Sequence, residues 1–244
     1  MLAAEETGSG RRLVLAHGFT QTARSWGPFA ALLEPGRQLV RVDLPGHGGS
    51  AAVRATLPES GRLLVAAGGD RPFDLLGYSL GARVALHAAL DRPDVVRRLV
   101  LVGATAGIED ETARRARRER DEALARNVEA DVDGFLARWV AMPMFAGVPD
   151  PGLTERRRNT ADGLASSLRL AGTGAQEPLW DRLGSLTCPM LAIAGADDVR
   201  FAVAARRMAR LAPHASVSLV PGAGHAVHLV QPRLTARIVE HFLA

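Results

Sequence analysis

Short apolar segments recur along the chain and alternate with longer amphipathic stretches. The segments are rich in Val, Leu and Ile and mostly end at Gly, Pro or Asp, which is typical of buried strands in a parallel sheet. They cover residues 13–19, 38–43, 73–78, 97–103, 189–195 and 216–221. Helix-like stretches separate them at 27–34, 80–91, 200–212 and 231–243. This alternation predicts an α/β fold with a mostly parallel sheet and helices on both faces.

Residues 108–186 interrupt the alternation. They contain no convincing strand and show helical patterns at 111–127, 131–140 and 152–171. A helical insertion between two strands of such a sheet typically covers the edge at which the strands end. We therefore predict a core formed by residues 1–107 and 187–244, with 108–186 as a helical cap inserted before the strand that carries the candidate acid.

Composition supports one globular domain with a sizeable core. Of the 244 residues, 47% are hydrophobic and 23% charged. No apolar run approaches the ~18 residues needed to cross a bilayer, and residues 1–10 contain no apolar segment of signal-peptide type, so no membrane insertion is predicted. Cys188 is the only cysteine, which excludes an intrachain disulfide. A reducing, cytoplasmic location is expected.

The charged residues argue against nucleic acid as a partner. The 30 basic residues are nearly balanced by 26 acidic ones, and aromatic residues, which would stack on bases, make up only 5% of the chain. All of the basic residues are arginines. A guanidinium group binds carboxylates and phosphates through paired hydrogen bonds, so arginines near a site would favour an acidic small molecule.

Residues 77–81 read Gly-Tyr-Ser-Leu-Gly and lie between a predicted strand and a predicted helix. This is the setting of a nucleophile elbow, a turn so tight that glycine is needed on either side of the serine. Ser79 would then be exposed at the amino end of the helix. The alternative is a chance Gly-x-Ser-x-Gly match, which the flanking strand and helix disfavour.

Two later loops carry the partners that a reactive serine needs. A histidine must accept the serine proton, and a carboxylate must orient the histidine. Asp197 and Asp198 follow the strand at 189–195, and His225 follows the next strand. Because parallel strands end at one edge of the sheet, we predict a triad of Ser79, Asp198 and His225. Asp197 is the alternative acid, but it is also well placed to cap the next helix.

Two further histidines are interpreted as structural. His228 and His225 suggest a metal pair, but no Glu or third ligand accompanies them, so no metal site is predicted. His47 lies in a loop rich in Gly and Pro and is expected to shape the turn. No cofactor is predicted.

The first predicted strand ends in His17-Gly18-Phe19. Where a sheet carries a nucleophile elbow, the oxyanion hole takes one backbone N–H from this loop and one from the residue after the nucleophile. These donors are predicted to be Phe19 and Leu80. The Phe19 ring can still pack in the core, because only its backbone would be used.

Together these motifs resemble the α/β-hydrolase superfamily over nearly the whole chain. A second set of residues is similar, more narrowly, to the 2-succinyl-6-hydroxy-2,4-cyclohexadiene-1-carboxylate synthases (MenH) of menaquinone biosynthesis, which are lyases despite their hydrolase fold. This set comprises Ser25-Trp26, Arg83, the arginine-rich stretch 114–121, and residues 135–139, 143–145, 157–159, 195–201 and 224–228.

The narrower resemblance implies a small substrate with several carboxylates. Arginines at positions that match Arg83, Arg117 and Arg157 would bind it, with Tyr78 and Trp139 also in contact. Fixed guanidinium groups can replace the water that surrounds carboxylates in solution, which agrees with this implication. The expected assembly is a monomer or a small homo-oligomer.

The implied reaction is elimination of pyruvate from 2-succinyl-5-enolpyruvyl-6-hydroxy-3-cyclohexene-1-carboxylate, with the Ser79–His225 pair as a proton relay. One alternative is a serine esterase or a carbon–carbon bond hydrolase in which Ser79 is a true nucleophile. Such an enzyme would have a mainly apolar cap, whereas this one is rich in Arg. A binding protein without turnover is disfavoured, because it has no use for a complete triad.

Overall fold

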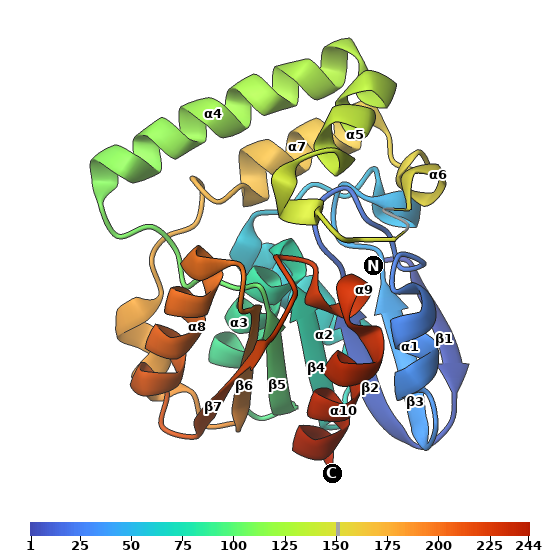
Figure 1. The fold of residues 1–244 in the computed structure, drawn as a ribbon, viewed down its shortest axis with the longest axis vertical. Helices are drawn as coiled ribbons and strands as arrows, with labels where there is room; N and C mark the ends of the chain where they lie inside the picture. The colour runs from blue at the N-terminus through green and yellow to red at the C-terminus, as the bar shows by residue number, and fades with distance from the viewer. Residues whose placement is uncertain (150–151) are drawn as a thin grey trace.

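The computed structural model describes residues 1–149 and 152–244, which form a single seven-stranded sheet with helices on both faces (Figure 1). The strand order is β1-β3-β2-β4-β5-β6-β7, and each neighbouring pair is parallel except β1 with β3. The mostly parallel sheet predicted from the sequence is confirmed. The strands are β1 (Ala4–Gly8), β2 (Arg11–Ala16), β3 (Arg37–Val42), β4 (Phe73–Tyr78), β5 (Val96–Val102), β6 (Met190–Gly195) and β7 (Ala215–Val220).

Two groups of helices bury the two faces of the sheet, and each group packs into its own apolar cluster. One face carries α1 (Gly27–Leu33), α9 (Val227–Val230) and α10 (Pro232–Leu243). The other carries α2 (Leu57–Gly68), α3 (Leu80–Asp91) and α8 (Val199–Leu211). Among the residues that the structure describes, none of the helices has the length and apolarity that a bilayer crossing requires.

A separate layer of helices lies over the ends of the strands (Figure 1). It consists of α4 (Glu111–Ala130), α5 (Val132–Val140), α6 (Leu153–Arg156) and α7 (Ala161–Ala171), which we call the cap. These helices have a small apolar core of their own, with Phe135 and Leu164 buried at its centre. The 3₁₀ helix η3 (Trp180–Ser185) falls within the predicted insertion, but Trp180 and Leu183 pack into the core cluster beside α3 and α8.

Two elements of the core were not expected from the sequence. Strand β1 pairs antiparallel with β3 at the edge of the sheet, and its polar sequence AEETG suits an edge that is exposed to solvent. Helix α2 begins with a capping box in which the Thr56 N–H donates to Glu59 Oε2 at 2.8 Å. That S/T-x-x-E pattern was a readable signal for the start of a helix. The two other 3₁₀ helices are η1 (Gly48–Ser50) and η2 (Pro143–Phe145).

The helix predicted over 152–171 is divided in two. Helix α6 ends at Arg156, and α7 begins at Ala161. The Thr160 side chain accepts a hydrogen bond from the Gly163 N–H at 3.1 Å and so caps the second helix. Residues 157–160, between the two helices, therefore form a non-helical break.

Candidate active site

The elbow that carries Ser79 joins β4 to α3, as the sequence predicts. Ser79 has φ +52°, a strained backbone conformation for a residue with a side chain. A Cβ added to Gly77 would lie 2.3 Å from the Gly81 carbonyl oxygen, and one added to Gly81 would lie 1.9 Å from the Ala16 carbonyl oxygen. Only glycine fits at these two positions. The turn is thereby clamped against β2, and it presents the serine at the end of the sheet.

Ser79, His225 and Asp198 lie in one hydrogen-bonded line. His225 Nε2 is 3.0 Å from Ser79 Oγ, and His225 Nδ1 is 3.1 Å from Asp198 Oδ2. The histidine is only 3% exposed, and its ring packs against Phe201 with the ring centroids 4.4 Å apart. Such an arrangement can pass a proton from the serine hydroxyl to the imidazole while the carboxylate stabilises the resulting charge.

Asp198 is held in its charged form. Partial burial alone would raise the pKa of its carboxyl group, but the hydrogen bond and charge of His225, the Phe201 N–H and the nearby Arg200 outweigh burial and lower that pKa. The same carboxylate caps α8 by accepting from the Phe201 N–H at 3.3 Å. The cap of α8 is therefore Asp198 itself, and the role considered for Asp197 is not found.

The two residues predicted to supply the oxyanion donors lie at the same cavity as the serine. Phe19 and Leu80 both line the cavity that contains Ser79. Leu80 is the first residue of α3, so its N–H has no acceptor within the helix. In the part of the chain that the structure describes, the Phe19 N–H forms no hydrogen bond. Both backbone donors are thus available to an oxygen atom of a ligand.

A cavity of about 330 Å³ lies between the sheet edge and the cap, with Ser79 and His225 in its wall. Its apolar lining includes Phe19, Leu124, Trp139, Met142, Met144, Leu168 and Phe201. Its charged lining consists of Arg83, Arg117, Arg120 and Arg200, and no acidic side chain is among the described residues that line it. Because cations surround a largely apolar space, the cavity suits a small anionic molecule with a hydrophobic ring.

Arg83 and Arg117 both line the cavity, one from α3 and the other from the cap helix α4. Burial and the charge of Arg117 lower the pKa of Arg83 to about 10, which leaves its guanidinium charged at neutral pH. One of its nitrogens, Nη1, donates to the Ala171 carbonyl oxygen at 2.9 Å. Arg117 is oriented by Asp121, whose Oδ1 lies 2.8 Å from Arg117 Nε. Both guanidinium groups are therefore fixed in place before any ligand binds.

Two residues named from the resemblance lie outside the cavity lining. Tyr78 is 2% exposed and packs its ring beneath His225 and His228. Arg157 points to solvent, with its Nε 2.9 Å from Asp133 Oδ1. Its neighbour Arg156 is instead buried, and its guanidinium contacts Thr20 Oγ1 and lies over the Phe145 ring.

Sequence reasoning did not single out Arg120, Arg156 or Arg200. Arg120 shares the arginine-rich helix with Arg117, where the run of cations hides which ones face inward. Arg156 is the first of three consecutive arginines, so no local pattern separates the buried one from its neighbours. Arg200 could have been recognised from the sequence, because it follows the candidate acid Asp198 by two residues.

His47 and His228 occupy the structural positions expected of them. His47 Nδ1 lies 3.0 Å from the Pro45 carbonyl oxygen, and His47 Nε2 accepts from the Thr20 N–H at 3.3 Å. His228 is enclosed by the rings of Trp26, Phe29 and Tyr78. Within the described residues, no group of three His, Cys, Asp or Glu side chains is arranged to hold a metal ion.

Replacing His228 by phenylalanine is expected to weaken the acid sensitivity of the fold. Burial and the charges of His225 and Arg156 lower the pKa of His228 from 6.5 to about 3. Between these values the unfolded chain takes up a proton that the folded one does not, so stability falls as the pH falls. From pH 7 to pH 5, the free energy of unfolding should drop by about 2 kcal/mol more in the wild type than in the variant.

Urea denaturation of both proteins at the two pH values measures this difference. Other buried histidines are present in both proteins and cancel in the comparison. Equal losses would show that His228 does not remain neutral in the folded state.

Comparison with known proteins agrees with this architecture. Residues 13–238 match the sequence profile of the Alpha/beta hydrolase family. The chain belongs to the alpha/beta hydrolase family. A protein of Bacillus subtilis (strain 168), provisionally named 2-succinyl-6-hydroxy-2,4-cyclohexadiene-1-carboxylate synthase, is 33% identical over 99% of this chain and 93% of its own length. The synthase of Serratia proteamaculans (strain 568) is 30% identical over 95% and 92%.

Solved structures are also similar to this chain over nearly its whole length. MenH from S. aureus superimposes with a TM-score of 0.90 at 27% identity, covering 98% of this chain and 97% of that one. An esterase from Thermogutta terrifontis, solved with malate bound, gives a TM-score of 0.84 at 25% identity over 99% and 92%. The predicted α/β-hydrolase fold and the resemblance to MenH are confirmed, and the chain is an enzyme of this family.

Proposed function

We propose that this enzyme eliminates pyruvate from 2-succinyl-5-enolpyruvyl-6-hydroxy-3-cyclohexene-1-carboxylate and forms 2-succinyl-6-hydroxy-2,4-cyclohexadiene-1-carboxylate in menaquinone biosynthesis. The observation that carries the proposal is a cavity with four arginines and no acidic side chain among its described lining, directly beside the Ser79–His225 pair. The proposed substrate is a ring that bears several carboxylates. Proteins named for this activity are 30–33% identical over nearly the whole chain.

The reaction begins with proton transfer along the triad. His225 Nε2 accepts the Ser79 hydroxyl proton as Ser79 Oγ removes a proton from the ring carbon next to the succinyl carbonyl group. Asp198 stabilises the imidazolium ion that forms. No covalent bond to the serine is needed, so the serine acts as a base relayed through the histidine.

The electron pair released from the C–H bond moves onto the succinyl carbonyl oxygen. The Phe19 and Leu80 N–H groups would stabilise the negative charge there. When the carbonyl group forms again, the electron pair shifts through the ring double bond, and the C–O bond to the enolpyruvyl group breaks. The leaving group takes up the proton that His225 holds and departs as pyruvate, and the ring keeps a second double bond.

The arginines orient the substrate for this proton transfer. Arg83 and Arg117 both line the cavity that contains the serine, so carboxylates bound to them would fix the orientation of the ring. Incubating the purified enzyme with the enolpyruvyl substrate and following pyruvate with a coupled dehydrogenase assay tests the proposal. Absence of pyruvate at micromolar enzyme would refute it.

Changing Arg83 to glutamine is expected to raise KM for this substrate by about 10- to 100-fold and to alter kcat by only a few-fold. The glutamine side chain is neutral and shorter than arginine, so the charge-assisted hydrogen bond to a carboxylate is lost. Steady-state pyruvate release measures both constants. Arg138→Gln is the matched control, since this exposed cap arginine lies outside the cavity lining and its loss should leave KM unchanged.

The triad geometry also suits ester hydrolysis through an acyl-enzyme, and the fold of the T. terrifontis esterase is closely similar. In that case Ser79 would be a covalent nucleophile. A burst of nitrophenol, equal in amount to the enzyme, from a nitrophenyl ester would favour the esterase. Pyruvate release without such a burst would favour the lyase.

A further inference from the structure

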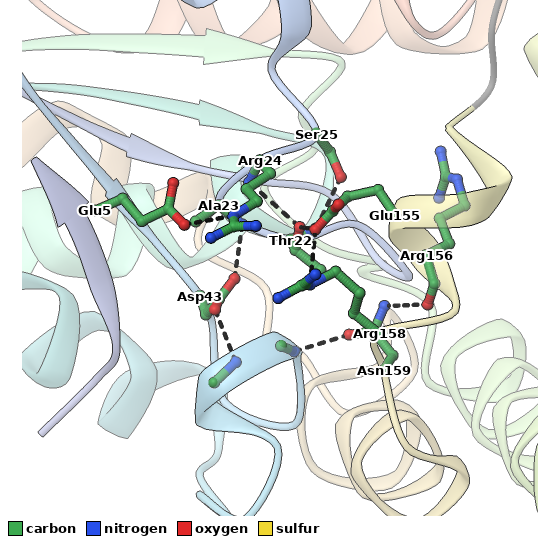
Figure 2. A network of polar contacts seen from close by, with 12 residues as sticks. Glu5, Thr22, Ala23, Arg24, Ser25, Asp43, Glu155, Arg156, Arg158 and Asn159 are labelled. Atoms are coloured by element: carbon green, nitrogen blue, oxygen red, sulfur yellow. Dashed lines mark hydrogen bonds and ion pairs between the residues drawn. The ribbon is translucent and has the colours of Figure 1, made fainter. Parts of the chain in front are cut away.

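A short segment at the base of the cap is bound to the loops of the core, as Figure 2 shows. We call residues 155–159 the cap foot. Glu155 accepts a hydrogen bond from Thr22 Oγ1 at 2.9 Å, and Arg158 Nε lies 3.2 Å from Glu155 Oε1. The loop that the cap foot contacts begins at His17 and contains Phe19. The cap is therefore connected directly to the loop that carries one of the proposed oxyanion donors.

Asn159 makes the most central of these contacts. It is 6% exposed, and both ends of its amide are hydrogen-bonded to backbone groups. Its Nδ2 donates to the Thr20 carbonyl oxygen at 2.7 Å and to the Arg156 carbonyl oxygen at 2.8 Å. Its Oδ1 accepts from the Gly48 N–H at 2.9 Å (Figure 2). One buried side chain thus joins the cap to two separate loops of the core.

Thr20, which Asn159 holds, has an unusual backbone conformation. Its φ is +67°, and the only other residue in the described chain with positive φ and a side chain is Ser79. A β-branched residue avoids this conformation unless its surroundings enforce it. Here the Thr20 N–H donates to His47 Nε2, its carbonyl oxygen accepts from Asn159, and its hydroxyl contacts Arg156. Each polar group of the strained residue is bound by a neighbour.

The conformation of Thr20 decides how the preceding residue is presented to the cavity. The Gly18 carbonyl oxygen accepts from the Gln21 N–H at 3.1 Å, which closes a tight turn through Phe19 and Thr20. The hydrogen bond from the Thr20 N–H to His47 prevents the Phe19–Thr20 peptide from rotating. With that peptide held, relaxation of Thr20 to negative φ would open this turn and move the Phe19 N–H. A donor displaced by about 1 Å loses most of its effect on a developing oxyanion.

We propose that Asn159 is a positioning residue that holds Thr20 in its strained conformation and thereby keeps the Phe19 N–H directed at the reacting oxygen. The inference rests on the proposed function, in which that N–H stabilises negative charge. It assigns the cap a part in building the oxyanion hole in addition to enclosing the substrate.

Two substitutions separate the bonds of Asn159. Asn159→Asp keeps the acceptor for the Gly48 N–H but places a carboxylate oxygen against the Thr20 carbonyl oxygen. Asn159→Ala removes all of the side-chain hydrogen bonds described above. Both variants are expected to lower kcat for pyruvate release by at least about tenfold while KM changes less than about twofold, because the cavity arginines are untouched.

Thr22→Val is the matched control. It removes another hydrogen bond between the cap foot and the same loop, two residues further along, and it does not touch Thr20. Its kcat should stay within about twofold of the wild type. If Thr22→Val lowers kcat as strongly as Asn159→Asp, general loosening of the cap explains the effect, and the inference is wrong.

Hydrogen exchange in the ligand-free protein provides a readout that does not depend on activity. The hydrogen-bonded amides of Gly18, Thr20 and Gln21 should exchange at least about tenfold faster in both Asn159 variants than in the wild type and Thr22→Val. Unchanged exchange there would overturn the inference whatever reaction the enzyme catalyses. Failure of the proposed function has a different signature, because the wild type would then release no pyruvate while the exchange difference persisted.

Discussion

Ser79→Ala is expected to lower kcat for pyruvate release by about 10³-fold or more, with KM within a few-fold of the wild type. The variant keeps the elbow, the arginines and both backbone donors, so substrate should still bind. It lacks the oxygen atom that removes the ring proton, and among the described residues His225 Nε2 has no other hydrogen-bond partner to relay that proton. Single-turnover and steady-state measurements of pyruvate release give both constants.

Ser167→Ala is the control for this variant. Ser167 also lines the cavity, but it forms no hydrogen bond with His225 in the part of the chain that the structure describes. Its replacement should leave kcat close to that of the wild type. A Ser79→Ala enzyme that retained more than about a tenth of the wild-type kcat would show that another group is the base.

Asp198→Asn is expected to lower kcat by about 10³-fold or more with little change in thermal stability. The amide cannot stabilise the imidazolium ion, and an amide NH₂ facing Nδ1 would favour the tautomer that leaves Nε2 protonated and unable to accept from Ser79. Asparagine caps a helix as well as aspartate does, so α8 should keep its start. Activity assays and thermal denaturation of one preparation measure both effects.

Asp197→Asn separates the two candidate acids of the same loop. Asp197 is exposed, and the carboxylate at hydrogen-bond distance from the histidine belongs to its neighbour. The variant should retain nearly full activity. If Asp197→Asn were the more damaging change, the acid of the triad would have to be reassigned.

Much of the fold follows from local chemistry that a reader of the sequence can recognise. The run Phe73–Tyr78 is apolar except at Asp74, overlaps the start of a Gly-x-Ser-x-Gly stretch, and leads into an alanine-rich helix, so strand, elbow and helix were all predictable. Strand β1 was not, because an edge strand exposes most of its side chains and carries no apolar run. The break between α6 and α7 was missed because its signal is the single cap at Thr160.

The candidate site could likewise be predicted only in part from the sequence. The types of residue that a proton relay needs, and their positions at the ends of strands, could be read from the sequence. Which of three consecutive arginines is buried could not, because Arg156, Arg157 and Arg158 share the same chemistry and differ only in the face of the chain that meets the core. The contact between Asn159 and Thr20 links residues 139 positions apart and has no local signature.

The sequence by itself determined the apolar strands, the elbow and the set of reactive groups, because turn geometry and apolar runs act over a few residues. Only the tertiary structure decided which arginines face the cavity and how the cap foot is bonded to the loop that contains Thr20. It also decided that His225 lies between Ser79 and Asp198. These outcomes depend on contacts between segments far apart in the chain, and the packing of the whole sheet and cap sets their distances.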